Sequence, residues 1–168
     1  NNYLNIVKEI GLKINLLQPL EEFPDSIFVE DPAIIYNSTC IILNPCDPSR
    51  NGEKNIIYQE LQTFFDTIIF VENGFIEGGD ILQIGDHFII GLSNRTNKIG
   101  ADNLSKLLNS LGASVSICQT PKSVLHFKSE CSLVDDDVIL VSNKMAQLEI
   151  LKKNYNLIVL PIGEEGAA

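Results

Sequence analysis

The chain has 168 residues, of which 45% are hydrophobic and 20% charged, an ordinary balance for one soluble globular domain with its own core. Its formal net charge of −10 argues against nucleic-acid binding, because phosphate contacts need clustered Lys and Arg residues and the 12 present are scattered. No apolar run reaches the roughly 18 residues that cross a bilayer, which argues against a membrane-spanning helix.

The N-terminal residues precede a repeated pattern. Apolar residues at helical spacing from Asn2 predict a helix that runs into a strand at 13–17. Pro19 then ends regular structure, and residues 21–25 are expected to form a loop. Because the sequence starts on Asn and stops where another repeat should begin, we expect an incomplete chain.

Three consecutive segments predict the same order of elements: two strands, a helix and a closing strand. The segments are 26–72, 73–120 and 121–161, with 162–168 opening a further one. The expected strands are 27–30, 34–36, 40–43, 67–71, 75–77, 81–84, 87–92, 113–118, 132–134, 138–142 and 157–160. The expected helices are 53–65, 100–111 and 144–154. No low-complexity linker separates the segments, so residues 1–168 are interpreted as one truncated α/β domain.

Polar residues recur at matching places in these segments. Glu30 and Glu77 each follow an apolar pair, and Arg50 and Arg95 each follow a small polar residue further along the same segment. His126 stands at the corresponding point of the third segment. Because repeated units place equivalent positions alike, these groups are expected to converge on a shared axis.

The segment N-G-F-I-E-G-G-D at 73–80 concentrates this pattern. Glu77 stands between an apolar approach and the pair Gly78-Gly79, where the missing side chains let a backbone or a ligand come close. A carboxylate buried there would need a cationic partner. The alternative is a β-turn with an exposed glutamate.

Two kinds of charge suggest a ligand. Several carboxylates facing one axis would hold a planar cation, and two arginines would suit a carboxylate, so together they describe an arginine-like zwitterion. The alternatives are a solvated Arg50 and a packed or surface His126. Residues 135–137 are read as a solvated acidic turn, because they lack the ligand spacing of a calcium loop.

Five motifs carry a resemblance to a known family. They are F-P-D-S-I-F-V-E-D at 23–31, P-S-R at 48–50, I-E-G-G-D-I-L at 76–82, G-L-S-N-R-T-N at 91–97 and L-H-F-K-S at 125–129. With these motifs the chain resembles the dimethylarginine dimethylaminohydrolases, members of the guanidine-modifying (amidinotransferase) superfamily that includes the arginine and agmatine deiminases. The resemblance implies an α/β propeller (pentein) of five ββαβ units, about three of which this chain contains.

The resemblance also implies an activity. It is hydrolysis of the guanidinium of N-methylated arginine, so that dimethylarginine gives citrulline and dimethylamine, with no metal or organic cofactor. The implied catalytic residues are His126, as proton donor and base, and Glu77, which would lie beside His126 and help hold the cation. The implied substrate-binding residues are Glu30 and Asp31 for the guanidinium, Asp25 for the α-amino end, and Arg50 and Arg95 for the carboxylate. The attacking group should be a cysteine thiolate.

The cysteines depart from the family pattern. The family's nucleophile lies near its C-terminus, and none of Cys40, Cys46, Cys118 and Cys131 lies in a matching motif. They form no C-x-x-C pair and no zinc spacing, which is typical of reduced thiols in a cytoplasmic protein. We therefore expect the nucleophile to lie outside this chain, which by itself would not complete the reaction.

Two other functions remain open. One is an arginine deiminase-like enzyme acting on unmethylated arginine, and the other is a catalytically incomplete fragment that binds a guanidinium ligand. A partly built propeller leaves strand edges free, so a homodimer or edge-mediated self-association is also expected.

Overall fold

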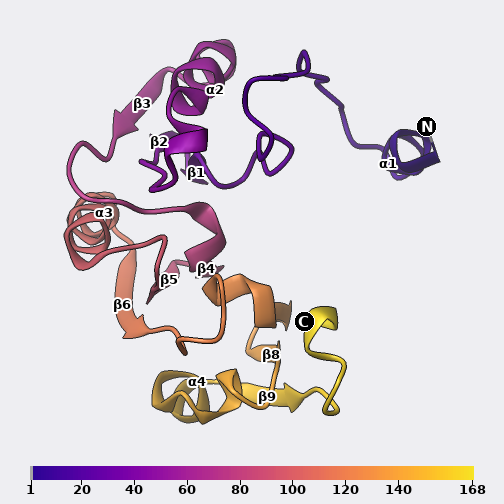
Figure 1. The fold of residues 1–168 in the computed structure, drawn as a ribbon, viewed down its shortest axis with the longest axis vertical. Coiled ribbons are helices and arrows are strands. Elements are labelled where there is room, and N and C mark those ends of the chain that lie inside the picture. Colours follow the sequence, from indigo (N-terminus) through magenta and orange to yellow (C-terminus); the bar gives the residue numbers. More distant parts are fainter. Residues whose placement is uncertain (1) are drawn as a thin grey trace.

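The computed structural model describes residues 2–168, so Asn1, the first residue of the expected domain, lies outside the described residues. Within residues 2–168 there are four α-helices, and nine strands form three small sheets that follow one another along the molecule (Figure 1). The helices are α1 (Asn2–Glu9), α2 (Glu53–Leu61), α3 (Lys98–Ser110) and α4 (Glu149–Asn154). The strands are β1 (Ala33–Tyr36), β2 (Thr39–Ile42), β3 (Thr67–Phe70), β4 (Ile81–Ile84), β5 (His87–Leu92), β6 (Ser114–Gln119), β7 (Cys131–Asp135), β8 (Val138–Val141) and β9 (Asn156–Val159).

All three sheets have the same topology. Their strand orders are β1-β2-β3, β4-β5-β6 and β7-β8-β9. In each sheet the first two strands form an antiparallel hairpin, and the third runs parallel to the second after a helical crossover. The expected mixed α/β class is therefore confirmed, whereas closure into a five-bladed propeller stays a prediction.

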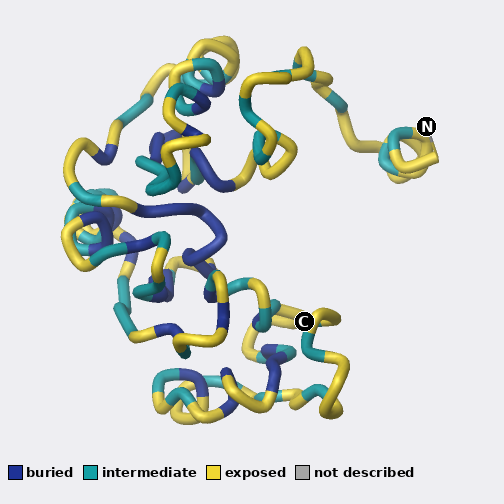
Figure 2. The backbone as a smooth tube through the Cα atoms, viewed as in Figure 1, coloured by how far each residue is buried: buried dark blue, intermediate teal, exposed yellow. Residues whose placement is uncertain are grey.

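Strand β5 is the centre of the core. Its four middle residues are all buried (Figure 2). Phe88 and Ile90 point into an apolar cluster shared with the first sheet and α3, while Ile89 points into a second cluster shared with the third sheet. Because side chains alternate along a strand, burial on both faces explains the unbroken apolar run in this part of the sequence.

Two expected strands are wrong. Residues 13–17 form coil, and no strand within residues 2–168 pairs with them. Residues 27–30 form turns, in which Phe28 N–H donates to Asp25 O and Asp31 N–H donates to Phe28 O. The apolar, β-favouring side chains there predicted a strand, but consecutive turn hydrogen bonds leave Ile27, Phe28 and Val29 exposed.

Three other expected elements are shorter than predicted. The helix expected at 53–65 is α2, which ends at Leu61. Instead of a strand at 75–77, a single antiparallel bridge joins Ile76 to Asn44. The helix expected at 144–154 is a short 3-10 turn followed by α4, because Leu148 has extended backbone angles between them. Apolar residues at helical spacing continue through this break, so the spacing gave no sign of it.

Helix α1 contributes no buried side chain (Figures 1 and 2). Tyr3 and Ile6 on it, and Ile10 just after it, are all exposed. Within residues 2–168, no helix combines the length and the apolar character that crossing a membrane would require. The expected self-association through strand edges stays a prediction.

The close approach of α3 to the segment before β4 depends on Gly100, which has no side chain. The Asn97 side chain accepts from Gly100 N–H (2.9 Å) and Phe75 N–H (3.1 Å), and a Cβ added at Gly100 would lie 2.3 Å from Phe75 O. Alanine normally favours a helix by about 1 kcal/mol over glycine. Here Gly100→Ala should instead lower the free energy of unfolding by about 1–3 kcal/mol, because backbone atoms must shift.

Urea denaturation of both proteins measures this change. Gly166→Ala is the matched control, because a Cβ there meets nothing within 4 Å. Unchanged or higher stability of Gly100→Ala would contradict the packing described for α3.

Candidate functional site

A cavity of about 400 Å³ lies where the first two sheets meet the segment that leads into the third. The turns before β1, the loop before α2, the short 3-10 turn Gly78–Asp80, the loop after β5 and the turn before β7 all contribute to it. The structure brings every residue expected at the site to this one cavity: Asp25, Glu30, Asp31, Arg50, Glu77, Arg95 and His126. Their catalytic and binding roles stay proposals.

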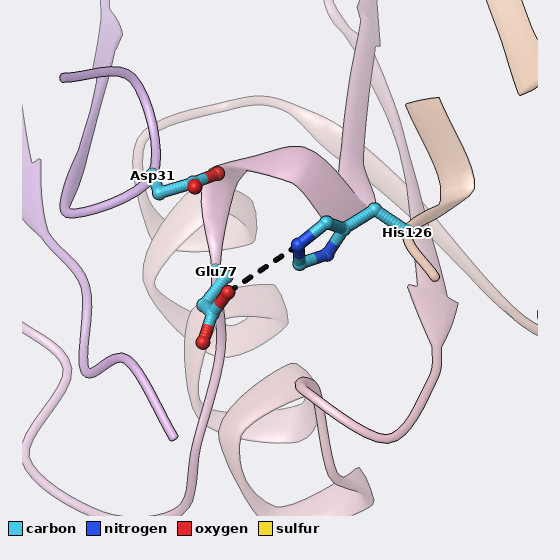
Figure 3. A group of neighbouring side chains, drawn as sticks. All are labelled: Asp31, Glu77 and His126. Atoms are coloured by element: carbon cyan, nitrogen blue, oxygen red, sulfur yellow. Dashed lines mark ion pairs between the residues drawn. The ribbon is translucent and has the colours of Figure 1, made fainter. Parts of the chain in front are cut away.

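Glu77 is fully enclosed, with no exposed surface. Its Oε1 accepts from the backbone N–H of Cys46 at 3.1 Å and lies 3.6 Å from Arg95 Nη1. Its Oε2 has no hydrogen-bond partner and faces His126 Nε2 at 3.5 Å (Figure 3). Burial raises the pKa of Glu77 more than the Cys46 hydrogen bond and the nearby positive charges lower it. The alternative of an exposed glutamate is wrong.

The glycine pair after Glu77 lets two turns touch. Gly78 N–H donates to Asp31 O, and a Cβ on Gly78 would lie 2.1 Å from Glu30 O. Gly79 N–H donates to Asp31 Oδ1 at 2.8 Å. A side chain at Gly78 would therefore force the turn that carries Glu30 and Asp31 away from the cavity.

Arg50 lies behind Asp31 with only 3% of its side chain exposed. Its Nη1 donates to Asp31 Oδ2 at 2.6 Å, while Nε and Nη2 donate to Glu53 Oε2 at 3.0 and 2.7 Å. Nη2 also donates to Phe28 O at 3.3 Å. Burial lowers the pKa of Arg50, but the hydrogen bonds and charges of Glu53 and Asp31 outweigh it and raise that pKa overall. The alternative of a solvated Arg50 is wrong, because this guanidinium clamps the turn that carries Asp31 to the first turn of α2.

Arg95 is the more accessible of the two guanidinium groups, with 26% of its side chain exposed. Its Nη1 lies 3.2 Å from Asp47 Oδ2. Lys128 adds another cation to the cavity wall, and its Nζ pairs with Glu30 at 3.2 Å.

His126 is held between two buried carboxylates. Its Nε2 faces Glu77, and its Nδ1 lies 3.3 Å from Asp80 Oδ2. Burial lowers the pKa of His126, but the hydrogen bond to Asp80 and the charges of Asp80, Asp31 and Glu77 raise it further, so the pKa is raised overall. The imidazole is therefore protonated to a higher pH than a free one.

Sequence reasoning missed three carboxylates that organise this site. Asp80 contacts His126, Glu53 pairs with Arg50, and Asp47 pairs with Arg95. Only Asp80 had a usable signal, as the second acidic residue of E-G-G-D in a buried turn. Asp47 and Glu53 looked like ordinary loop and helix-start residues.

The cavity can hold one cationic group. An oxygen of Asp31, an oxygen of Glu77 and a nitrogen of His126 all lie within 4.8 Å of one another. Figure 3 shows these three side chains converging from separate segments. A guanidinium or a metal ion would fit this charge, and the expectation that no metal is used stays a prediction.

Comparisons with known proteins identify relatives of this chain. A family model described as arginine deiminase matches residues 14–159. The chain is 35% identical over its full length to an N(G),N(G)-dimethylarginine dimethylaminohydrolase of Pseudomonas aeruginosa, spanning 66% of that protein. It is 30% identical over 99% of its length to the corresponding protein of Streptomyces coelicolor, spanning 63% of it.

A solved structure gives the same result. The P. aeruginosa enzyme, as a cysteine-to-serine variant complexed with citrulline, matches with a TM-score of 0.92 at 36% identity. The match covers 99% of this chain and 65% of that one. The chain thus spans slightly less than two thirds of the length of these relatives.

Arg50→Met tests the buried clamp. Without the guanidinium, Asp31 and Glu53 stay buried with no cation, which should lower the free energy of unfolding by about 3–5 kcal/mol in a urea titration. Lys98→Met breaks the exposed Lys98–Asp102 pair (2.8 Å) and serves as the control. The control should lose no more than about 0.5 kcal/mol. Equal losses in the two variants would contradict the clamp.

His126→Gln tests the raised pKa. A histidine whose pKa rises above 6.5 on folding stabilises the fold fully below pH 6.5, and this stabilisation is lost as pH rises through the folded pKa. The stability deficit of His126→Gln, measured by urea denaturation at several pH values, should therefore shrink above pH 6.5.

His87→Gln provides a control of opposite sign. Burial lowers the pKa of His87 below 6.5, so the contribution of this histidine is complete above pH 6.5 and is lost as pH falls through its folded pKa. A deficit of His126→Gln that does not change with pH would contradict the raised pKa of that residue.

Proposed function

The chain belongs to the arginine deiminase family, and from that premise we propose that the protein hydrolyses the guanidinium group of N-methylated arginine. Dimethylarginine is converted to citrulline and dimethylamine. The proposal depends chiefly on one observation, the cavity in which Asp31, Glu77 and His126 converge within 4.8 Å. Similarity to dimethylarginine dimethylaminohydrolases favours methylated arginine over other guanidines.

The substrate guanidinium lies between Asp31 and Glu77. A planar guanidinium pairs with carboxylates through charge-assisted hydrogen bonds. Arg50 already neutralises Asp31, whereas Glu77 Oε2 has no donor, so Glu77 supplies most of the charge that attracts the cation. Glu30 lines the same cavity and adds a further acceptor.

The amino-acid end of the substrate needs the opposite charges. Asp25, which lines the cavity, is the acceptor for the α-amino group. Both arginines are candidates for the carboxylate, but the accessible Arg95 suits direct contact better. Arg50 acts on this end only indirectly, because its donors are engaged by Asp31, Glu53 and Phe28 O.

The reaction proceeds through a covalent intermediate. A thiolate attacks the guanidinium carbon, and the C–N bond to the methylated nitrogen breaks as His126 donates a proton to the leaving amine. The neutral imidazole then takes a proton from water, which attacks the same carbon, and the thiolate leaves. The net change replaces one C–N bond by a C–O bond.

The nucleophile is a cysteine other than the four in this chain. None of Cys40, Cys46, Cys118 and Cys131 lines the cavity. Burial raises the pKa of Cys118 to about 11 and that of Cys131 to about 12, which disfavours the thiolate form. Burial also raises the pKa of Cys40.

A second substrate is unmethylated arginine, favoured by the description of the matching family model. The cationic head and the zwitterionic tail are common to both molecules, so the charges of the cavity do not separate them. Relative rates on the two substrates decide between the two activities.

Citrulline formation from asymmetric dimethylarginine, measured with the full-length protein that contains these residues, tests the proposal. His126→Gln should lower kcat by about 10²- to 10⁴-fold, because proton transfer to the amine is lost. Asp31→Asn should raise KM, because the cation loses part of its cradle.

The controls locate the chemistry. Asp86→Asn, whose native side chain accepts from Tyr36 away from the cavity, should leave the rate unchanged, as should serine at each of the four cysteines. The 168-residue chain alone should form no citrulline. Faster turnover of arginine would favour the second substrate, and ligand binding without turnover by the full-length protein would favour a guanidinium-binding protein.

A further inference from the structure

The turn after Glu77 carries a second buried carboxylate with no role in the reaction described so far. We propose that Asp80, rather than Glu77, positions the imidazole of His126 and selects its Nδ1–H tautomer. The tautomer follows from the geometry alone, whereas its catalytic meaning rests on the proposed hydrolysis.

Asp80 holds His126 at two points. Its Oδ1 accepts from the backbone N–H of Phe127, the next residue, at 2.9 Å. Its Oδ2 lies 3.3 Å from Nδ1 of the imidazole. One carboxylate with no exposed surface therefore fixes both the main chain and the ring of this histidine.

Glu77 is placed less well for this task. Its Oε2 lies 3.5 Å from Nε2 and makes no hydrogen bond, whereas the shorter contact of 3.3 Å between Asp80 Oδ2 and Nδ1 is a hydrogen bond. Glu77 lines the cavity, whereas Asp80 does not. This division leaves Glu77 free for the substrate cation while Asp80 acts on the ring from behind.

The partners of Asp80 fix its own orientation. Ser93 Oγ–H donates to Asp80 Oδ2 at 2.6 Å, and the same hydroxyl accepts from the backbone N–H of Arg95 at 2.9 Å. A Cβ on Gly79 would lie 2.9 Å from His126 Cγ, so the ring packs directly over this glycine. Through Ser93, Asp80 thus connects His126 to the loop that carries Arg95.

The tautomer matters for the chemistry. A carboxylate beside Nδ1 favours a proton on that nitrogen, because a lone pair there would face negative charge. The neutral ring then presents the Nε2 lone pair toward the cavity, and the protonated ring presents Nε2–H. These are the states that a group needs to accept a proton from water and to donate one to an amine.

Imidazole 15N NMR of this chain tests the assignment without any turnover. The sequence has two histidines, so His87→Gln leaves His126 as the single imidazole signal. Above its pKa, His126 should carry its proton on Nδ1. Asp80→Asn places an amide N–H₂ beside Nδ1 and should move the proton to Nε2, whereas Glu77→Gln should leave it on Nδ1.

Three outcomes of this experiment are decisive. A neutral His126 protonated on Nε2 in the otherwise native chain would overturn the proposal, even if Asp80→Asn does not fold. A folded Asp80→Asn that keeps the Nδ1 proton, or a Glu77→Gln that loses it, would also overturn it.

Kinetics of the full-length protein separate positioning from simple stability. Asp80→Asn should lower kcat by about 10²- to 10⁴-fold with KM little changed, because the base and acid are mispositioned while the cavity wall stays intact. Ser93→Ala keeps the charge of Asp80 and should cost less. A change confined to KM would argue against positioning. Lack of turnover in the unsubstituted protein would refute the hydrolase assignment but not the tautomer.

Discussion

Burying a carboxylate costs free energy unless hydrogen bonds or a cation replace its water, and three buried carboxylates at the site meet this constraint in different ways. Asp31 is neutralised by Arg50, and Asp80 is surrounded by donors from Ser93, Phe127 and His126. Glu77 is left with one oxygen that has no partner. The least compensated charge therefore lies where a positively charged ligand gains most by binding.

The same constraint explains the division between rigid and adaptable parts of the site. Arg50 and Asp80 have almost no exposed surface, and each joins segments that are distant in sequence. Arg95 and Lys128 are partly exposed, and their partners Asp47 and Glu30 are also accessible to solvent. Of the groups proposed to bind the substrate, Asp31 and Glu77 are thus buried and preset, whereas Glu30 and Arg95 belong to more exposed pairs that can adjust.

Much of the fold and of the candidate site could be predicted from the sequence, because the local sequence patterns agree with the contacts that these residues make in the folded structure. The apolar run of β5 and the hairpin turn before it predicted the second sheet, and the recurrence of Glu30, Glu77 and His126 predicted residues that share one cavity. The turn at 27–30 was missed because its apolar side chains favour a strand, and only backbone hydrogen bonds distinguish the two. The burial of Arg50 was missed because it depends on Glu53 and Asp31, whose pairing appears only in three dimensions.

Strand β5 connects the two apolar clusters that support the cavity. Phe88 and Ile90 belong to one apolar cluster and Ile89 to the other, so the two clusters share a single backbone segment. Three residues that line the cavity come from different segments. Asp31 precedes the first sheet, Glu77 the second and His126 the third. Loss of either cluster would disturb the strand that both require, so the shared strand couples the packing of the two clusters. The positions of the groups that line the cavity therefore depend on the packing of both clusters and not on local contacts alone.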